Sequence, residues 1–178
     1  MLKTIALQRD ICWESPIENR LQIEKLIHGL PSFDLLILPE MFTTGFSMNS
    51  VNIAENHIGD TPIWMQSIAK KKGGTIMGSV PVKNEDLFYN RLYVVSSDEI
   101  EYYDKRHLFS MAGEHLHYAP GTRNITIKLG KWKIRPLVCY DLRFPIWSRN
   151  EMIDDQYAYD ILVYVANWPA ARSDAWVS

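Results

Sequence analysis

Three short, continuous apolar runs constrain the fold of this chain most strongly. They cover residues 35–38, 136–138 and 161–165. Each is too short to be a helix of ordinary length, and each ends in a loop or turn signal. Runs of this kind are typical of strands that are covered on both faces, as in the sheets of α/β proteins. The sequence therefore predicts an α/β fold with mixed sheet character.

Amphipathic segments and hairpins lie between these runs. Ser15, Pro16 and Glu18 predict a helix start with a capping box, and Gly29 predicts its end. A second helix is expected from Thr61-Pro62 to residues 70–73, where lysines and a glycine suit a C-terminus. Further expected elements are strands at 2–8 and 75–81, hairpins at 87–96/99–104 and 124–129/132–139, and a helix at 144–153.

Composition narrows the class of protein. The 178 residues predict one domain over 1–178, and 47% hydrophobic content can supply its core. A net charge of -2 argues against a nucleic-acid partner, which needs a basic surface. No apolar run approaches the length of a membrane span. Two distant cysteines, Cys12 and Cys139, argue against a disulfide framework and favour the cytoplasm.

Polar side chains follow the apolar runs at the points where each strand ends. Glu40 follows the first run, Cys139 the second and Asn167 the third. Lys105 ends a hairpin strand in the same way. Ligands of α/β sheets bind beyond the carboxyl ends of strands, so these groups predict a site. Cys139 also precedes an expected helix, whose N-terminus would lower the thiol pKa, although a buried packing role is the alternative.

Three blocks in this order resemble the nitrilase superfamily of carbon–nitrogen hydrolases. They are Leu-Pro-Glu-Met-Phe at 38–42, Tyr-Asp-Lys-Arg-His-Leu-Phe at 103–109 and Val-Cys-Tyr-Asp-Leu-Arg-Phe-Pro at 138–145. The segments 41–46 and 167–172 are most similar to the omega-amidase branch, which hydrolyses 2-oxoglutaramate and 2-oxosuccinamate. The resemblance implies a four-layer α-β-β-α sandwich, a homodimer, and catalysis with no metal or organic cofactor.

The resemblance also implies roles for individual residues. Cys139 would be the nucleophile and Glu40 the general base. Lys105 and the backbone N–H of Tyr140 would stabilise the tetrahedral oxyanion. Glu114 would be a supporting acid that orients Lys105 and the substrate. Candidates for substrate binding are Arg143, which could pair with a substrate carboxylate or serve a structural ion pair, and Trp168.

Two other chemistries remain open from the residues alone. A papain-like hydrolase would pair Cys139 with His107, His115 or His117. Zinc would find suitable ligand types in Glu114, His115, His117 and Cys139, although their spacing matches no common zinc pattern. Within the superfamily, a nitrilase or a carbamoyl hydrolase is the alternative to an amidase.

The family comparison also changes how the chain's length is interpreted. Family members continue with another helix and several strands, and residues 171–176 resemble the start of that helix. We therefore expect a sandwich that is incomplete at its C-terminus. A non-catalytic fragment or binding module that keeps the family's residues is the alternative.

Overall fold

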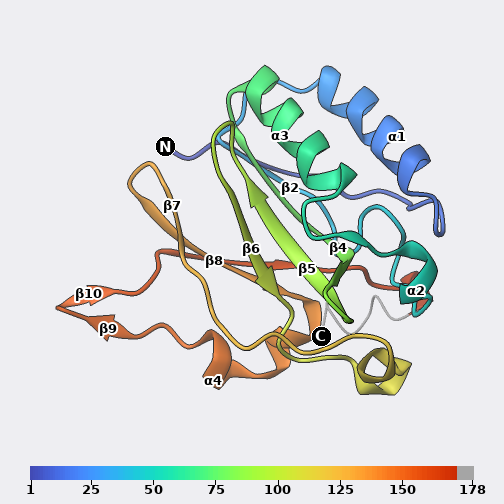
Figure 1. The fold of residues 1–178 in the computed structure, drawn as a ribbon. Helices are drawn as coiled ribbons and strands as arrows, with labels where there is room; N and C mark the ends of the chain where they lie inside the picture. Colours follow the sequence, from blue (N-terminus) through green and yellow to red (C-terminus); the bar gives the residue numbers. More distant parts are fainter. Residues whose placement is uncertain (172–178) are drawn as a thin grey trace.

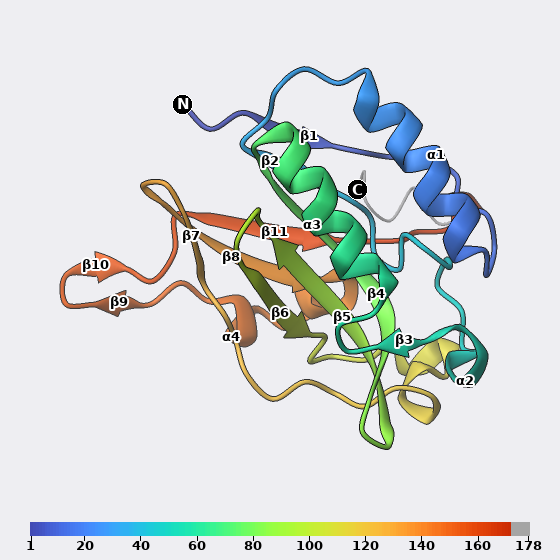
Figure 2. The same cartoon turned by 45° about the horizontal axis from the view of Figure 1, so that its top comes forward.

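The computed structural model describes residues 1–171 of the chain. Its larger sheet has the strand order β1-β2-β4-β5-β6, and β3 pairs with the C-terminal end of β4 (Figure 1; β1 and β3 are labelled in Figure 2). β1, β2 and β4 run parallel, whereas β4, β5 and β6 form antiparallel hairpins. The strands are β1 (Thr4–Ala6), β2 (Leu35–Ile37), β3 (Glu55–Asn56), β4 (Thr75–Asn84), β5 (Leu87–Val95) and β6 (Ile100–Asp104).

Two helices of 13 residues each, α1 (Pro16–His28) and α3 (Asp60–Lys72), lie on one face of this sheet (Figure 2). The short helix α2 (Ser50–Ile53) precedes β3. Apolar side chains of α1 and α3 pack against Leu36, Ile76 and Val80 of the sheet. α3 ends at Gly73, which adopts a φ of +74° that glycine tolerates without a Cβ clash.

A second sheet, with the order β11-β8-β7, lies over the other face of the first. It comprises β7 (Ile127–Leu129), β8 (Trp132–Val138) and β11 (Ile161–Val165). Because successive strand residues point to opposite faces, Leu35 packs between the sheets while Leu36 faces the helices. The described residues thus form three of the expected layers, in the order α-β-β.

Both predicted hairpins and both early helices are confirmed, but two details of the prediction are wrong. β4 continues to Asn84 and pairs with β5, beyond the strand expected at 75–81. The side chain of Ser15 makes no cap hydrogen bond, so the predicted capping box is not formed, although α1 does begin at Pro16.

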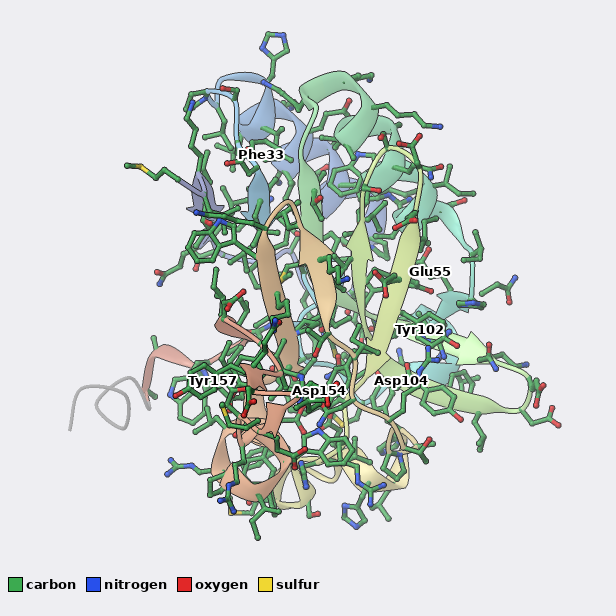
Figure 3. The ribbon with its side chains drawn as sticks, turned by 90° about the vertical axis from the view of Figure 1, so that its left-hand side faces the viewer. Phe33, Glu55, Tyr102, Asp104, Asp154 and Tyr157 are labelled. Carbon is green, nitrogen blue, oxygen red and sulfur yellow. The ribbon has the colours of Figure 1, made fainter. Side chains whose placement is uncertain are left out.

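The helix predicted at 144–153 is also wrong. Helix α4 (Pro145–Ser148) lasts four residues, and a hairpin of β9 (Met152–Ile153) and β10 (Gln156–Tyr157) follows. Asp154 and Asp155 between these strands both have positive φ, which suits a two-residue hairpin turn and is incompatible with a helix. The hairpin projects from the body as an arm in Figure 1 and Figure 2, and Figure 3 labels Asp154 and Tyr157, which lie on it.

No helix within residues 1–171 has both the length and the apolar character needed to cross a bilayer.

Candidate active site

Four loops that follow strands bring polar groups together at one end of the two sheets. Glu40 follows β2, Lys105 follows β6, Cys139 follows β8 and Asn167 follows β11. The first two strands belong to the larger sheet and the last two to the smaller one. The expected convergence of these side chains is therefore confirmed, and it occurs where the sheets face each other.

Lys105 is the centre of the cluster. Its Nζ lies 2.8 Å from Oε1 of Glu40 and 2.9 Å from Oε2 of Glu114. All three side chains are at most 1% exposed. Buried charges of this kind persist only when they are paired, and here one ammonium serves two carboxylates. The structure thus places Glu114 beside Lys105, as the resemblance implied.

The ends of the neighbouring strands hold Lys105 in place. Its backbone N–H donates to the carbonyl of Asn90 at 3.0 Å. Asp104, which precedes it at the end of β6 (Figure 3), accepts two bonds from the Arg91 guanidinium at 2.7 and 2.9 Å. A bidentate pair of this type fixes geometry as well as supplying energy. Lys105 therefore follows a strand end whose position is fixed by these bonds.

Burial and neighbouring charges shift the pKa values of this cluster in opposite directions. Burial alone would lower the pKa of Lys105, but the charges of Glu40 and Glu114 raise it above its usual range. Burial raises the pKa of Glu114, with Lys105 opposing and Glu40 adding to the rise. These two shifts are compatible, since one cation cannot fully compensate two buried anions. Lys105 is therefore charged, and burial favours the protonated form of Glu114.

Cys139 occupies a strained turn between β8 and a 3₁₀ helix at Cys139–Arg143. Its φ of +40° is unusual for any residue other than glycine and indicates a position fixed by its surroundings. Met41, immediately after Glu40, has a φ of +45°. Strain of this type concentrates at functional sites, and here it lies at Cys139 itself and at the residue next to Glu40.

The expectation that a helix N-terminus lowers the Cys139 pKa is wrong. Burial raises the pKa of the thiol above its usual range, the charge of Glu40 raises it further, and Lys105 only partly opposes the rise. A hydrogen bond with Glu40 adds to the increase. The helix after Cys139 has only five residues and supplies too little dipole to reverse these effects. At rest the group is a neutral thiol beside a carboxylate.

Asp141 joins the cysteine turn to the lysine loop. Its buried carboxylate accepts bonds from the backbone N–H of Val138 at 3.0 Å and that of His107 at 2.9 Å. It also accepts the hydroxyl of Tyr103 and pairs with Nδ1 of His107. One anion therefore ties the residue before Cys139 to the segment after Lys105.

Asn90 is a member of the cluster that the sequence reasoning missed. This fully buried β5 side chain donates from Nδ2 to Oε1 of Glu40 at 2.8 Å and to Oε1 of Glu114 at 3.2 Å. The signal was present in the predicted hairpin, because a turn at Ser97-Asp98 sets residue 90 opposite residue 105. The backbone amide of Asn167 is a further contact, donating to Oε2 of Glu40 at 3.1 Å.

An open cavity of about 1400 Å³ lies against the cluster. Cys139, Glu40 and Lys105 form part of its wall, and Trp168 and Tyr140 line it as expected. Arg143 is exposed and does not belong to this cavity wall, so its role in binding the substrate carboxylate stays a prediction. Among residues 1–171, Arg9 is the arginine that lines the cavity, and the sequence reasoning missed it.

The histidines do not form the Cys–His arrangement that remained open. His107 pairs with Asp141 and stacks on the ring of Phe144 at 3.8 Å. His115 and His117 are exposed. Within residues 1–171, none of the three is hydrogen-bonded to Cys139, and no group of three potential ligands is arranged to hold a metal ion.

Comparison with known proteins agrees with this geometry. The family model for carbon–nitrogen hydrolases matches residues 6–177. The chain is 43% identical to omega-amidase YafV of Yersinia enterocolitica, covering 98% of this chain and 66% of that protein. It is 34% identical to 2-oxoglutaramate amidase of Bacillus subtilis, covering 97% and 67%. It thus spans about two thirds of the length of these relatives.

Solved structures show the same relationship. XC1258 from Xanthomonas campestris, a CN-hydrolase superfamily protein, is 40% identical with a TM-score of 0.94, covering 98% of this chain and 68% of that chain. Fold and cluster together define an α/β sandwich with a buried Cys-Glu-Lys-Glu site. The chain belongs to the carbon–nitrogen hydrolase family.

Proposed function

We propose that the protein hydrolyses the terminal amide of small 2-oxo dicarboxylate monoamides, such as 2-oxoglutaramate and 2-oxosuccinamate, and releases ammonia through a cysteine thioester. The observation that carries this proposal is the contact of Cys139, Glu40 and Lys105 at the wall of one cavity. The proposed substrate class is supported by the 43% identity to an omega-amidase and the 34% identity to a 2-oxoglutaramate amidase.

In this proposal Cys139 attacks the amide carbon while Glu40 accepts the thiol proton. An amide is a poor electrophile and requires a strong nucleophile. The raised pKa of the thiol means that few molecules hold a free thiolate at rest. Proton transfer to the neighbouring carboxylate therefore accompanies formation of the S–C bond, which is general-base catalysis by Glu40.

The tetrahedral intermediate carries a negative oxygen that needs donors. Lys105 Nζ and the backbone N–H of Tyr140 are the proposed pair, and each such donor is worth about 3–4 kcal/mol in the barrier. Glu40 returns its proton to the leaving nitrogen, and ammonia departs. Water, activated by the same carboxylate, then hydrolyses the thioester to the acid and restores the thiol.

Glu114 acts through Lys105 in this scheme. It does not line the cavity, and it contacts the lysine at 2.9 Å and the backbone N–H of Phe109. Its proposed role is to hold the ammonium toward the cavity and keep it charged, because the charge of Glu114 contributes to the raised pKa of Lys105.

Arg9 and Trp168 are the proposed substrate-binding residues. The Arg9 guanidinium donates to the carbonyls of Asp10 and Asn19 and to the side chain of Gln22, all neutral acceptors. Among the described residues it therefore has no carboxylate partner, and its charge remains to attract an anionic substrate. Trp168 offers an apolar wall for the short carbon chain.

Ammonia release from a panel of compounds tests the proposal. The panel contains 2-oxoglutaramate, 2-oxosuccinamate, glutamine, asparagine, a short aliphatic nitrile and a carbamoylated amine. We expect turnover of the two 2-oxo amides at rates at least tenfold above the others. Preference for the nitrile or the carbamoyl compound would contradict the amidase assignment, and no turnover of any member would favour the non-catalytic fragment.

The proposal extends to organisation and location. Residues 1–178 belong to one carbon–nitrogen hydrolase domain that acts as a cytoplasmic homodimer on a small amide and water, without nucleic-acid or membrane partners. Both cysteines are free thiols, which supports a reducing compartment. Large apolar side chains such as Ile146 and Met111 are exposed, which supports an interface between subunits. Sedimentation velocity tests the dimer, and a single monomeric boundary at 50 μM would contradict it.

A further inference from the structure

Asn90 contacts both carboxylates of the cluster and lies behind them as seen from the cavity. It is fully buried, and it is not part of the cavity wall. Its single amide group Nδ2 donates to Oε1 of Glu40 at 2.8 Å and to Oε1 of Glu114 at 3.2 Å. The side chain therefore touches the anions of the site without reaching a molecule in the cavity.

The chemistry of the neighbours fixes the orientation of this amide. Carboxylates accept hydrogen bonds, so the NH₂ end must face them, and the opposite orientation would set three oxygens together. This orientation leaves the other end of the amide unsatisfied: Oδ1 is buried without a hydrogen-bond partner among the described residues. A buried acceptor of this kind is uncommon in folded proteins and calls for an explanation.

The bonds to Glu40 distinguish its two oxygens. Oε1 accepts from Asn90 Nδ2 and from Lys105 Nζ, both at 2.8 Å. A carboxylate oxygen has about two lone-pair sites, so this oxygen is fully occupied. Among the donors within residues 1–171 other than the Cys139 thiol, the backbone N–H of Asn167 is the one that Oε2 accepts, at 3.1 Å. Oε2 keeps one site for a proton.

We propose that Asn90 is a positioning residue that directs the proton of Cys139 to Oε2 of Glu40 and keeps that carboxylate ionised. This inference rests on the proposed function, in which Glu40 is the base. The step is a transfer of the proton from Sγ to Oε2 as the sulfur lone pair bonds to the electrophile. Asn90 supplies neutral donors where a second cation would otherwise be needed to balance Glu40 and Glu114.

Alkylation of the cysteines by iodoacetamide, followed by peptide mass spectrometry from pH 5 to 9, tests the proposal without amide turnover. In Asn90→Leu, we expect the acid limb of the Cys139 rate profile to move up by about 1–2 pH units, because a carboxylate that loses a donor protonates more readily. The Cys139 rate should therefore fall most at the acid end of the range, near pH 5, and approach the parent rate above pH 7.

Two controls separate positioning from loss of structure. Asn124→Leu removes another amide whose Oδ1 is also buried without a partner, but that amide donates to the carbonyl of Trp147. Its Cys139 profile should match the parent. Alkylation of Cys12 is measured in the same peptide mass spectra, and its dependence on pH should be unchanged in every variant.

Asn90→Ala is measured alongside, since it removes the amide without adding volume. A folded Asn90 variant whose Cys139 profile superimposes on the parent overturns the proposal, as does an equal change at Cys12. A shifted profile in a protein that turns over no 2-oxo amide would support the role of Asn90 while rejecting the amidase assignment. Turnover of a 2-oxo amide together with an unshifted Cys139 profile would support the amidase assignment while rejecting the role of Asn90.

Discussion

Replacing Lys105 by Met is the perturbation whose consequences follow most directly from the structure. The side chain is wholly buried, and its ammonium lies 2.8 Å from Glu40 and 2.9 Å from Glu114. At an effective dielectric constant of about 20, a contact at this distance is worth about 6 kcal/mol before desolvation. Removing one partner of a buried pair costs about 3–5 kcal/mol of unfolding free energy, and here two carboxylates lose their cation.

The dependence on pH has a definite sign. Burial already raises the pKa of Glu114, and Lys105 is the main opposing influence. Without Lys105 the pKa of Glu114 rises further above its value in the unfolded chain, so the folded state binds more protons than the unfolded state. The free energy of unfolding of Lys105→Met then falls as pH rises, and part of the loss is recovered near pH 5.

Urea denaturation of the parent and variants at pH 5, 6, 7 and 8 measures both effects. Lys71→Met is the matched control, because Lys71 pairs with Glu24 at the surface, where a pair contributes about 0–1 kcal/mol. Adding Glu114→Gln to Lys105→Met should restore part of the loss at pH 8. A Lys105→Met loss no larger than that of Lys71→Met, or a loss independent of pH, would refute this reasoning.

Two further predictions concern neighbouring groups. The N–H groups of Val138 and His107 bond different oxygens of Asp141, so Asp141→Asn presents an NH₂ group to one of these donors in either orientation; unfolding free energy should fall by about 2–3 kcal/mol, and kcat should fall with it. Unchanged urea midpoint and kcat would contradict the bridging role of Asp141. Arg9→Gln should raise KM for 2-oxoglutaramate about tenfold, with little change for the neutral amide butyramide. Equal changes in KM for both amides would count against Arg9 as the carboxylate partner.

Features that depend on local pattern were predictable from the sequence. Continuous apolar runs marked β2, β8 and β11, and each run led to a polar residue of the cluster. Strand ends converge by the geometry of sheets, so the sequence alone groups Glu40, Cys139 and Asn167. The same logic placed Lys105, because the hairpin of β5 and β6 has its turn where Ser97-Asp98 predicted it.

Features that depend on tertiary surroundings were not predictable in the same way. The apolar residues at 144–153 suit a helix, but Asp154 and Asp155 turn the chain back and Asn150 bonds to Tyr159 across the arm. The pKa of Cys139 depends on burial and on a carboxylate almost 100 positions earlier in the chain, which outweigh a short helix. The hairpin register sets Asn90 opposite Lys105, but its bonds to Glu40 and Glu114 depend on loops from elsewhere in the chain and are visible only in the three-dimensional structure.

Ammonia release by Cys139→Ala tests the central claim most directly, with 2-oxoglutaramate as substrate and Cys12→Ala as the matched control. Cys12 lies at the start of the chain, where its sulfur accepts a bond from Gln22 and takes no part in the cluster. We predict that kcat falls at least 1000-fold in Cys139→Ala, since no other group in the cluster can form the thioester, while Cys12→Ala keeps the parent rate. Turnover near the parent rate in folded Cys139→Ala would contradict the account.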